Sequence, residues 1–150
     1  MNTTVNAGKI LRQKGFGYHG IGPHATAFDA LERMEEKNIG ALMVVEEGKL
    51  IGVFSERDYA RKVVLKGRSS KTTTVMEVMS GSPVFVSPAA SLHDCMVLMT
   101  EKKIRHLPVI DTNTLLGVVS MRDVVHAIIS EQEATIEELE EYIAGTGYRA

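Results

Sequence analysis

The sequence carries the pattern Ser-x-Arg-Asp twice, and its residue types suit recognition of a sugar phosphate. The copies are Ser55, Arg57 and Asp58, and Ser120, Arg122 and Asp123. An arginine beside the backbone amides of a first helical turn suits an anion such as phosphate. A carboxylate would repel phosphate, but it can accept hydrogen bonds from two vicinal hydroxyls, as a ribose offers. The pattern therefore indicates one nucleotide site in each copy.

The same residues also fit an ordinary helix start. A serine at the N-cap with an acidic residue three positions later caps the first turn without any ligand. That explanation accounts for the serine and the aspartate, but not for the repeated arginine, because a cation in the first turn opposes the helix dipole. Both interpretations, nucleotide site and helix cap, stay open at this point.

The two patterns lie within a longer internal repeat. The segment Gly40 to Asp58 reappears as Arg105 to Asp123, at a constant offset of 65 (120 minus 55). The offset continues back to Pro23 and Pro88 without a gap. A constant offset of this length indicates duplication of one supersecondary unit. If one copy forms a binding site, the other copy should form a corresponding site.

Each copy predicts the order β-α-β-β-α. Short strands are expected around 18–21 and 83–86, and Thr26 and Ser91 fit the N-caps of the first helices. Those helices carry inward apolar residues at helical spacing, namely Ala27, Ala30, Leu31 and Met34, and Leu92, Cys95, Met96 and Met99. The runs 41–45 with 50–54, and 106–110 with 115–119, predict hairpins.

A second helix in each copy and a tail complete the prediction. The second helices should direct inward Tyr59, Val63 and Val64, and Val124, Val125, Ile128 and Ile129. The polar segment Gly67 to Thr74 reads as the connector between the copies. Thr135 and Glu138 fit a capping box that starts a tail helix, with an apolar stripe of Ile136, Leu139 and Ile143, closed by Gly145. We expect this tail to pack on its own domain or on a dimer mate.

Composition narrows the class of protein. A formal net charge of -2 over 150 residues offers no basic field for a nucleic-acid backbone. No apolar run approaches the roughly 20 residues of a membrane helix, and the N-terminus lacks a signal or transit pattern. The one cysteine, Cys95, agrees with a reducing compartment and a buried, inert thiol. We therefore expect a cytoplasmic protein that binds neither nucleic acid nor membrane.

The histidines predict no metal site. The five histidines show neither i, i+4 helical spacing nor an accompanying cysteine pair. They are expected to be surface or packing residues.

The element order, the duplication, the Gly-Val-x-Ser-x-x-Asp junctions and the segment Ile104 to Val109 together resemble a cystathionine-β-synthase (CBS) domain pair. The resemblance covers Lys9 to Glu131 and is strongest for stand-alone pairs described as signal-transduction or energy-sensing proteins. It implies an α/β (α+β) fold in which tandem β-α-β-β-α repeats form a pseudo-two-fold Bateman module. The expected domains are repeat one at 9–68, repeat two at 75–131, and an amphipathic helix and tail at 132–150.

The resemblance also implies a ligand and its site. In such pairs the junction aspartate holds ribose hydroxyls and the serine three residues earlier contacts ribose or phosphate, which carries over to Asp58 with Ser55 and to Asp123 with Ser120. The adenine would lie in an apolar slot, for which the candidates are Tyr18, His19, Ile21, Ser82, Pro83 and Val84. AMP is the first ligand expected, with ADP, ATP, NAD or S-adenosylmethionine as alternatives, and no metal.

The two sites are expected to be unequal. Arg105 and His106 precede the Leu-Pro-Val strand, where the family often places phosphate contacts. The first copy has Gly40 and Ala41 at the matching positions. The second copy therefore has phosphate candidates that the first lacks.

The expected function is a non-enzymatic regulatory module that senses an adenine nucleotide between its repeats. The resemblance implies a homodimer, a flat four-repeat disk, and an effector protein that responds in trans. One alternative is a structural dimeric adaptor whose clefts stay empty. Another is a small nucleotide-processing enzyme, which is less supported because no histidine is repeated beside the Ser-x-Arg-Asp patterns.

Overall fold

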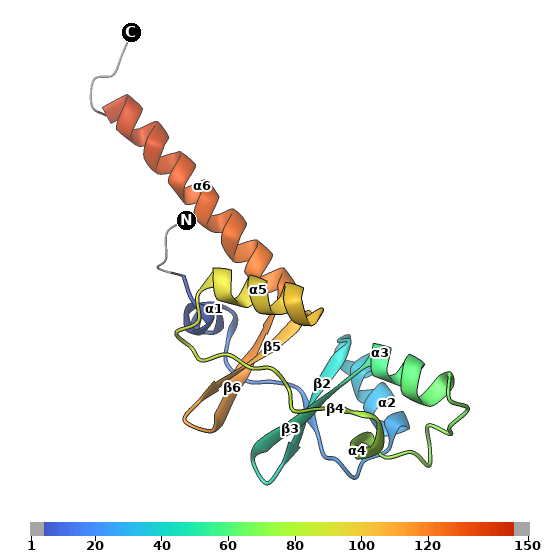
Figure 1. The fold of residues 1–150 in the computed structure, drawn as a ribbon. Helices are drawn as coiled ribbons and strands as arrows, with labels where there is room; N and C mark the ends of the chain where they lie inside the picture. The colour runs from blue at the N-terminus through green and yellow to red at the C-terminus, as the bar shows by residue number, and fades with distance from the viewer. Residues whose placement is uncertain (1–4, 146–150) are drawn as a thin grey trace. The chain divides into compact units, whose positions relative to one another are not determined.

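The computed structural model describes residues 5–145, and these form two compact units (Figure 1). The first-copy unit consists of residues 16–85 and 110–117. The second-copy unit consists of the described parts of 1–15, 86–109 and 118–150. The segment ahead of each copy belongs to the unit of the other copy.

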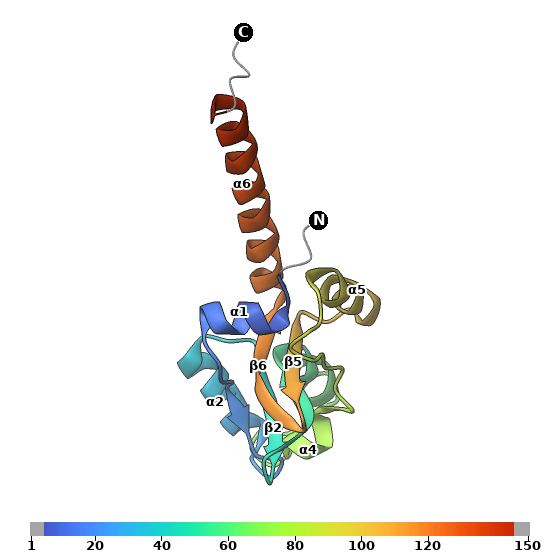
Figure 2. The same ribbon diagram turned by 90° about the vertical axis from the view of Figure 1, so that its left-hand side faces the viewer.

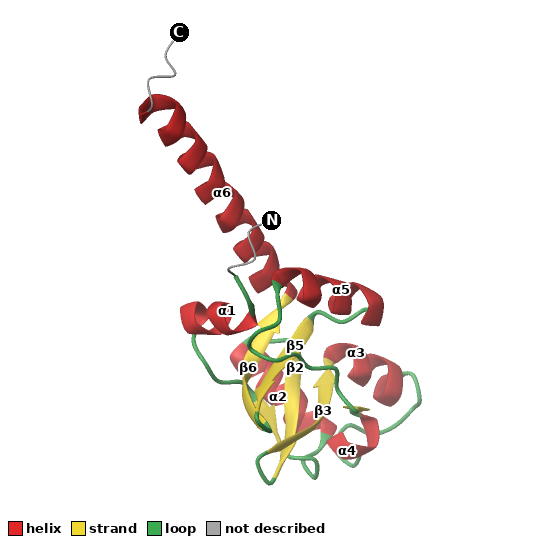
Figure 3. Ribbon diagram, turned by 60° about the vertical axis from the view of Figure 1, so that its left-hand side comes forward, coloured by secondary structure: helices red, strands yellow, loops and turns green. Residues whose placement is uncertain are grey.

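The first-copy unit is a four-stranded sheet with helices packed against it (Figure 3). The strand order is β1-β2-β3-β4, from Gly20–Ile21, Ala41–Glu46, Lys49–Ser55 and Ser80–Gly81. β1 pairs with β2 in parallel, and the other pairs are antiparallel. The helices are α2 (Ala27–Lys37), α3 (Glu56–Asp58), the π-helix η1 (Tyr59–Val64) and α4 (Val75–Val78). The predicted first hairpin is confirmed by β2 and β3.

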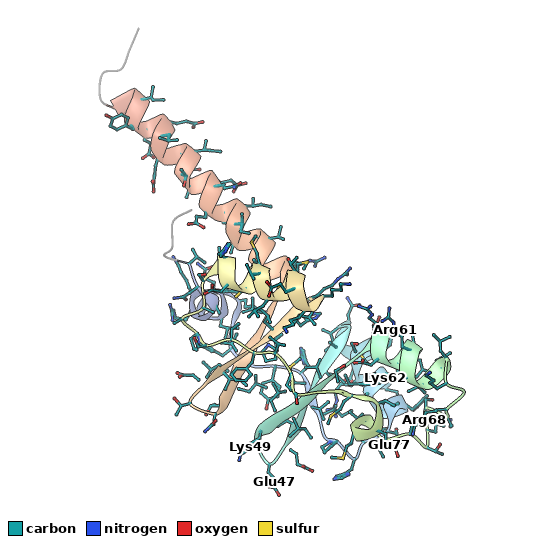
Figure 4. All side chains as sticks on the ribbon, viewed as in Figure 1. Glu47, Lys49, Arg61, Lys62, Arg68 and Glu77 are labelled. Carbon is teal, nitrogen blue, oxygen red and sulfur yellow. The ribbon has the colours of Figure 1, made fainter. Side chains whose placement is uncertain are left out.

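A hydrophobic core holds these elements together. Ala27, Ala30 and Met34 form the buried face of α2, as the helical spacing predicts. They pack in one cluster with strand residues Leu42, Val44 and Phe54 and with Val63, Val75 and Val78 from the helices that follow. The connector is tied to α4 by an ion pair between Arg68 and Glu77 at 3.0 Å, both labelled in Figure 4.

The second-copy unit joins a two-stranded sheet to three helices. Its strands are β5 (His106–Asp111) and β6 (Thr114–Ser120), which confirm the second predicted hairpin, although the hairpin tip groups with the first-copy unit. Its helices are α1 (Ala7–Lys14), α5 (Leu92–Lys102) and α6 (Met121–Gly145). Figure 2 shows α1 beside the start of α6. Backbone amides of Ala7 and Gly8 donate to carbonyls of Ala90 and Pro88 at 2.9 and 2.8 Å.

The predicted helix starts are confirmed. At Thr26 and at Ser91 the side chain accepts from the backbone N–H three residues later, and the aspartate there accepts from the cap residue. The prediction of a buried Cys95 is confirmed as well, and burial raises the pKa of its thiol.

Several predictions of inward side chains are wrong. Val63 and Val124 are buried, whereas Val64, Val125 and Ile129 are about half exposed. A helix that packs on one neighbour buries one stripe, and the residue after each buried valine lies about 100° further round. Met96 is likewise exposed on α5, while Met34 and Met99 are buried.

Two element boundaries also differ from prediction. No separate tail helix begins at Thr135, because α6 runs unbroken from Met121 to Gly145 and the Thr135 hydroxyl donates to the Glu131 carbonyl within it. The strand expected around 83–86 is reduced to one parallel bridge between Val86 and Val109. No helix among residues 5–145 is long and apolar enough to span a bilayer.

Candidate functional site

Both Ser-x-Arg-Asp junctions form capping boxes at the point where a strand enters a helix. The Asp58 backbone N–H donates to Ser55 Oγ at 3.1 Å, and the Ser55 N–H donates to Asp58 Oδ2 at 3.0 Å. The same pair of bonds joins Ser120 and Asp123, at 3.1 and 2.8 Å. The helix-cap interpretation is therefore confirmed in both copies, and any ligand must share these carboxylates with the cap.

In the first copy, Asp58 is also approached from two other segments. Its second oxygen, Oδ1, accepts from the Ser80 hydroxyl at 3.1 Å and lies 3.2 Å from the Lys62 ammonium. Ser80 is in β4, and Lys62, labelled in Figure 4, is in η1. The carboxylate thus sits where β3, η1 and β4 meet, with both hydroxyl and cationic donors around it.

In the second copy, the corresponding carboxylate is paired with the N-terminal helix. Lys14, the last residue of α1, places its ammonium 2.7 Å from Asp123 Oδ2. The same ammonium donates to the Val118 carbonyl at 2.9 Å. Two acceptors hold the lysine at the junction, so a positive charge stands beside the carboxylate proposed to bind ribose.

The electrostatics of the second junction follow from this lysine. Burial acts to raise the pKa of Asp123, but the hydrogen bonds from Lys14 and from the Ser120 amide outweigh it and leave the pKa below its usual value. Burial and then the Lys14 charge lower the pKa of His106, while Asp123 acts in the opposite direction. The charges of Lys14 and Asp123 thus both act on His106, a coupling that the sequence alone does not reveal.

A groove of about 760 Å³ extends from this junction along α1 and α6. Its lining includes Lys9 and Lys14 from α1 and Arg122, Asp123 and His126 from α6. Lys9, Lys14 and Arg122 thus line the groove together with the Asp123 carboxylate, and Glu131 and Glu138 line it as well. Such a surface suits a ligand that carries both phosphate and hydroxyl groups.

The predicted arginines occupy exposed positions. Arg57, Arg105 and Arg122 are all exposed, and Arg122 lines the groove. The backbone carbonyl of Arg105 accepts from the Met121 N–H at 2.8 Å, which ties the start of β5 to the start of α6. This bond explains how a residue far from the junction in sequence comes close to it.

The adenine candidates do not converge within the first-copy unit. They fall into two segments, next to β1 and next to β4, and these strands form opposite edges of the sheet. Tyr18 and His19 are exposed, but Ile21 is buried in the core, which leaves its backbone to meet a base. Ser82, with a φ of 49°, is exposed, and Pro83 and Val84 are half-buried.

Sequence reasoning missed three residues that reach the junction carboxylates. Lys62 lies four residues after Asp58, a helical spacing that could have found it. Ser80 lies next to the predicted slot segment but outside its bounds. Lys14 has no sequence signal, because 109 residues separate it from Asp123. Among the described residues, no three histidine, cysteine or acidic side chains form a cluster that could hold a metal ion.

Known proteins share both the sequence and the fold. A family model for the CBS domain matches residues 18–65 and 75–130. The CBS domain-containing protein CBSX3, mitochondrial, of Arabidopsis thaliana is 41% identical over 128 residues, which are 82% of this chain. The chain spans 62% of the length of that relative. CBS domain-containing protein YhcV of Bacillus subtilis (strain 168) is 38% identical over 76% of this chain and 81% of its own.

A solved structure extends the likeness to three dimensions. A protein with CBS domains from Burkholderia ambifaria MC40-6 has a TM-score of 0.81 and 42% identity, covering 85% of this chain and 96% of that one. The mixed α and β architecture and both repeats are thus shared along most of the chain. The chain belongs to the CBS domain family, with two CBS repeats.

Proposed function

We propose that this chain is a non-enzymatic regulatory module that binds an adenine nucleotide, AMP first, at its two junction aspartates. The observation that carries the proposal is that each capping aspartate is paired with further donors. These are Ser80 from another strand and Lys62 from the next helical turn at Asp58, and Lys14 from the N-terminal helix at Asp123. A helix cap alone needs none of these donors. Ribose hydroxyls would replace or join them at the carboxylate.

The cations beside each carboxylate supply the phosphate contacts in this proposal. Lys14, Arg122 and His106 would face the phosphate at the second junction, with Arg105 and Ser120 near it. Lys62 and Arg57 would serve at the first junction, with Ser55. The donor sets differ, so the two sites should differ in their preference among AMP, ADP, ATP and NAD.

Known structures support the ligand class at the level of the fold. A CBS domain protein from Pyrobaculum aerophilum, 21% identical with a TM-score of 0.71, is complexed with AMP. At that identity it shows only that this fold can hold the nucleotide. The proposal for this chain therefore rests on the chain's own carboxylates and cations.

The proposed regulation requires nucleotide binding but no catalysed reaction. A nucleotide that binds one arrangement of the chain better than another shifts the population toward that arrangement, by no more than its difference in affinity. We propose that the chain acts as a homodimer, that an effector protein in trans responds to this shift, and that both act in the cytoplasm. Cell fractionation tests the compartment, since the Arabidopsis relative is named as mitochondrial.

The test replaces each junction aspartate by asparagine. Asp58→Asn and Asp123→Asn remove the negative charge but keep an oxygen that can accept the cap hydrogen bond. Calorimetric titration with AMP should show roughly tenfold or greater loss of affinity at the altered site, because a charged hydrogen bond is worth about 1.5–3 kcal/mol. Incubation with ATP or NAD should give no product.

Two matched controls separate binding from capping. Asp29 and Asp94 occupy the same position in the capping boxes of α2 and α5. Asp29→Asn and Asp94→Asn should therefore show the stability cost of altering a capping box alone, and leave AMP affinity unchanged. AMP affinity that is unaltered in the double variant of Asp58 and Asp123 would overturn the proposal in favour of an adaptor.

A further inference from the structure

Helix α6 has apolar side chains along most of its length that the rest of the described chain leaves exposed. Figure 1 shows the C-terminal part of α6 projecting beyond α1 and α5. Val125, Ile129, Ile136, Leu139 and Ile143 are between 49% and 57% exposed. Large apolar side chains that repeat along one helix in this way mark a contact with another molecule.

Their spacing is that of a coiled-coil seam. Positions 125, 129, 132, 136, 139 and 143 are separated by four and three residues in alternation. This is the a and d pattern of a heptad repeat, with Ile129, Ile136 and Ile143 at a. The groove beside α1 uses the opposite face of the helix, through Ala127, Ser130 and Ala134. No seam residue lines that groove, although Thr135, which flanks the seam, does.

We infer that α6 forms a parallel, two-stranded coiled coil with α6 of a second copy of this chain. Isoleucine stands at all three a positions, and Leu139 stands at d. β-Branched residues at a with leucine at d favour two parallel strands over higher oligomers. The other d positions are Val125 and Gln132, and Gln132 is the one polar residue in this seam.

The charges of α6 select the parallel orientation. Its six glutamates from Glu131 to Glu141 all lie off the seam, with Glu133 and Glu140 at the flanking e positions. In an antiparallel pair, e positions face e positions, so these glutamates would meet. In a parallel pair, g faces e, so Thr135 of one copy lies beside Glu140 of the other.

The seam is short, so the two helices need support from the folded units to which they are attached. Residues 125–143 make fewer than three full heptads, which is marginal for isolated helices in water. Each helix is, however, continuous with a folded unit that holds its first turns. A contact between the folded units of the two copies would raise the local concentration of the two helices. The inference does not depend on nucleotide binding, because the seam contains no junction residue.

Single cysteines in the full chain test the pairing. The native Cys95 is fully buried, so the wild-type chain gives the background level of cross-linking. Ile136→Cys and Ile143→Cys, each at an a position, should form a disulfide-linked species of twice the 16.4 kDa chain under mild oxidation. Glu137→Cys, at an outward position, is the matched control and should not form the disulfide-linked species.

Each result decides the matter. A disulfide between the two chains of Ile143→Cys requires parallel alignment. In an antiparallel pair, only a residue near the middle of the seam lies opposite the same residue of the other chain. Cross-linking at Ile136 alone would therefore overturn the parallel arrangement. Cross-linking of Glu137→Cys as efficient as that of Ile136→Cys would overturn the seam.

Sedimentation provides a second measurement that does not depend on oxidation. Ile136→Glu should weaken the dimer roughly tenfold or more, since charges would face each other in the seam, while its circular dichroism stays that of wild type. A monomeric wild-type chain, or a variant dimer as tight as wild type, would overturn the inference. Another occupant of the seam would then have to be sought.

Discussion

At the scale of single residues, Lys14 is the side chain with most influence on the second junction. It pairs with Asp123 at 2.7 Å and lowers the pKa of both Asp123 and His106. Its ammonium donates to Oδ2 of that carboxylate, the oxygen that also accepts from the Ser120 N–H, so two ribose hydroxyls that donate to both carboxylate oxygens would compete with it. Nucleotide binding and the position of this lysine are therefore coupled.

Lys14→Met should raise the pKa of His106 and of Asp123, because it removes a positive charge near each. The histidine shift is measured by NMR titration of its ring protons. Lys9→Met is the control, since Lys9 lines the same groove without affecting either pKa. A His106 pKa identical in Lys14→Met and wild type would contradict the geometry at this junction.

The same substitution has a defined effect on stability as pH changes. A carboxylate whose folded pKa is lowered stabilises the fold above its unfolded pKa of about 3.9, and this contribution is lost as the pH falls through the folded value. Lys14→Met should thus lower the denaturation midpoint at neutral pH and match wild type in acid. An equal difference at both pH values would rule out the ion pair as its source.

At the scale of elements, the first junction depends on how closely β3 and β4 approach. Gly52 in β3 pairs with Gly81 in β4. A Cβ on Gly52 would lie 2.9 Å from the Ser80 carbonyl oxygen and 2.5 Å from the Met79 sulfur. Ser80 is the residue whose hydroxyl contacts Asp58, so strand spacing and site geometry are linked.

Gly52→Ala should therefore damage both stability and the first site. Overpacking of this kind costs about 1–3 kcal/mol, measured by chemical denaturation. AMP affinity should fall at the Asp58 site, measured in an Asp123→Asn background. Gly81→Ala is the matched control, because a Cβ there meets nothing within 4 Å. Equal losses in the two variants would contradict the argument that the close approach at Gly52 is their cause.

The helices show how local and tertiary effects divide. The capping boxes at Thr26 and Ser91 form from residues three apart, so sequence spacing predicts them. Thr135 and Glu138 have the same spacing but lie inside α6, where the Thr135 hydroxyl bonds a carbonyl of its own helix. A capping pattern starts a helix only where the chain has not already entered one.

At the scale of the whole molecule, the repeat predicts two sites and the structure makes them different. Asp58 has a serine and a lysine beside it, whereas Asp123 has Lys14, and the charges of Lys14 and Asp123 both act on His106. The affinity of the second site should consequently depend more strongly on the phosphate group of the ligand. Comparing the affinities for AMP and adenosine isolates that dependence.

Titrations of single-site variants test this asymmetry. The ratio of AMP to adenosine affinity should be larger in Asp58→Asn, which keeps the second site, than in Asp123→Asn, and it should fall with added salt. Nucleotide at 100 times its dissociation constant should stabilise either variant by about 2.7 kcal/mol. Equal ratios in the two variants would show that Lys14 and His106 do not contact phosphate.

The sequence by itself determined the duplication, the two hairpins and the first helix of each copy, and it offered the capping role of Ser55, Asp58, Ser120 and Asp123 as one of two interpretations. These features depend on residues that are neighbours in the chain, so spacing and side-chain type suffice. Only the tertiary structure decided that Lys14 and Ser80 meet the junction carboxylates, that Ile21 enters the core, and that Val125 and Ile129 face outward. Those outcomes depend on which surfaces pack together over separations of up to 109 residues, and local propensity carries no information about them.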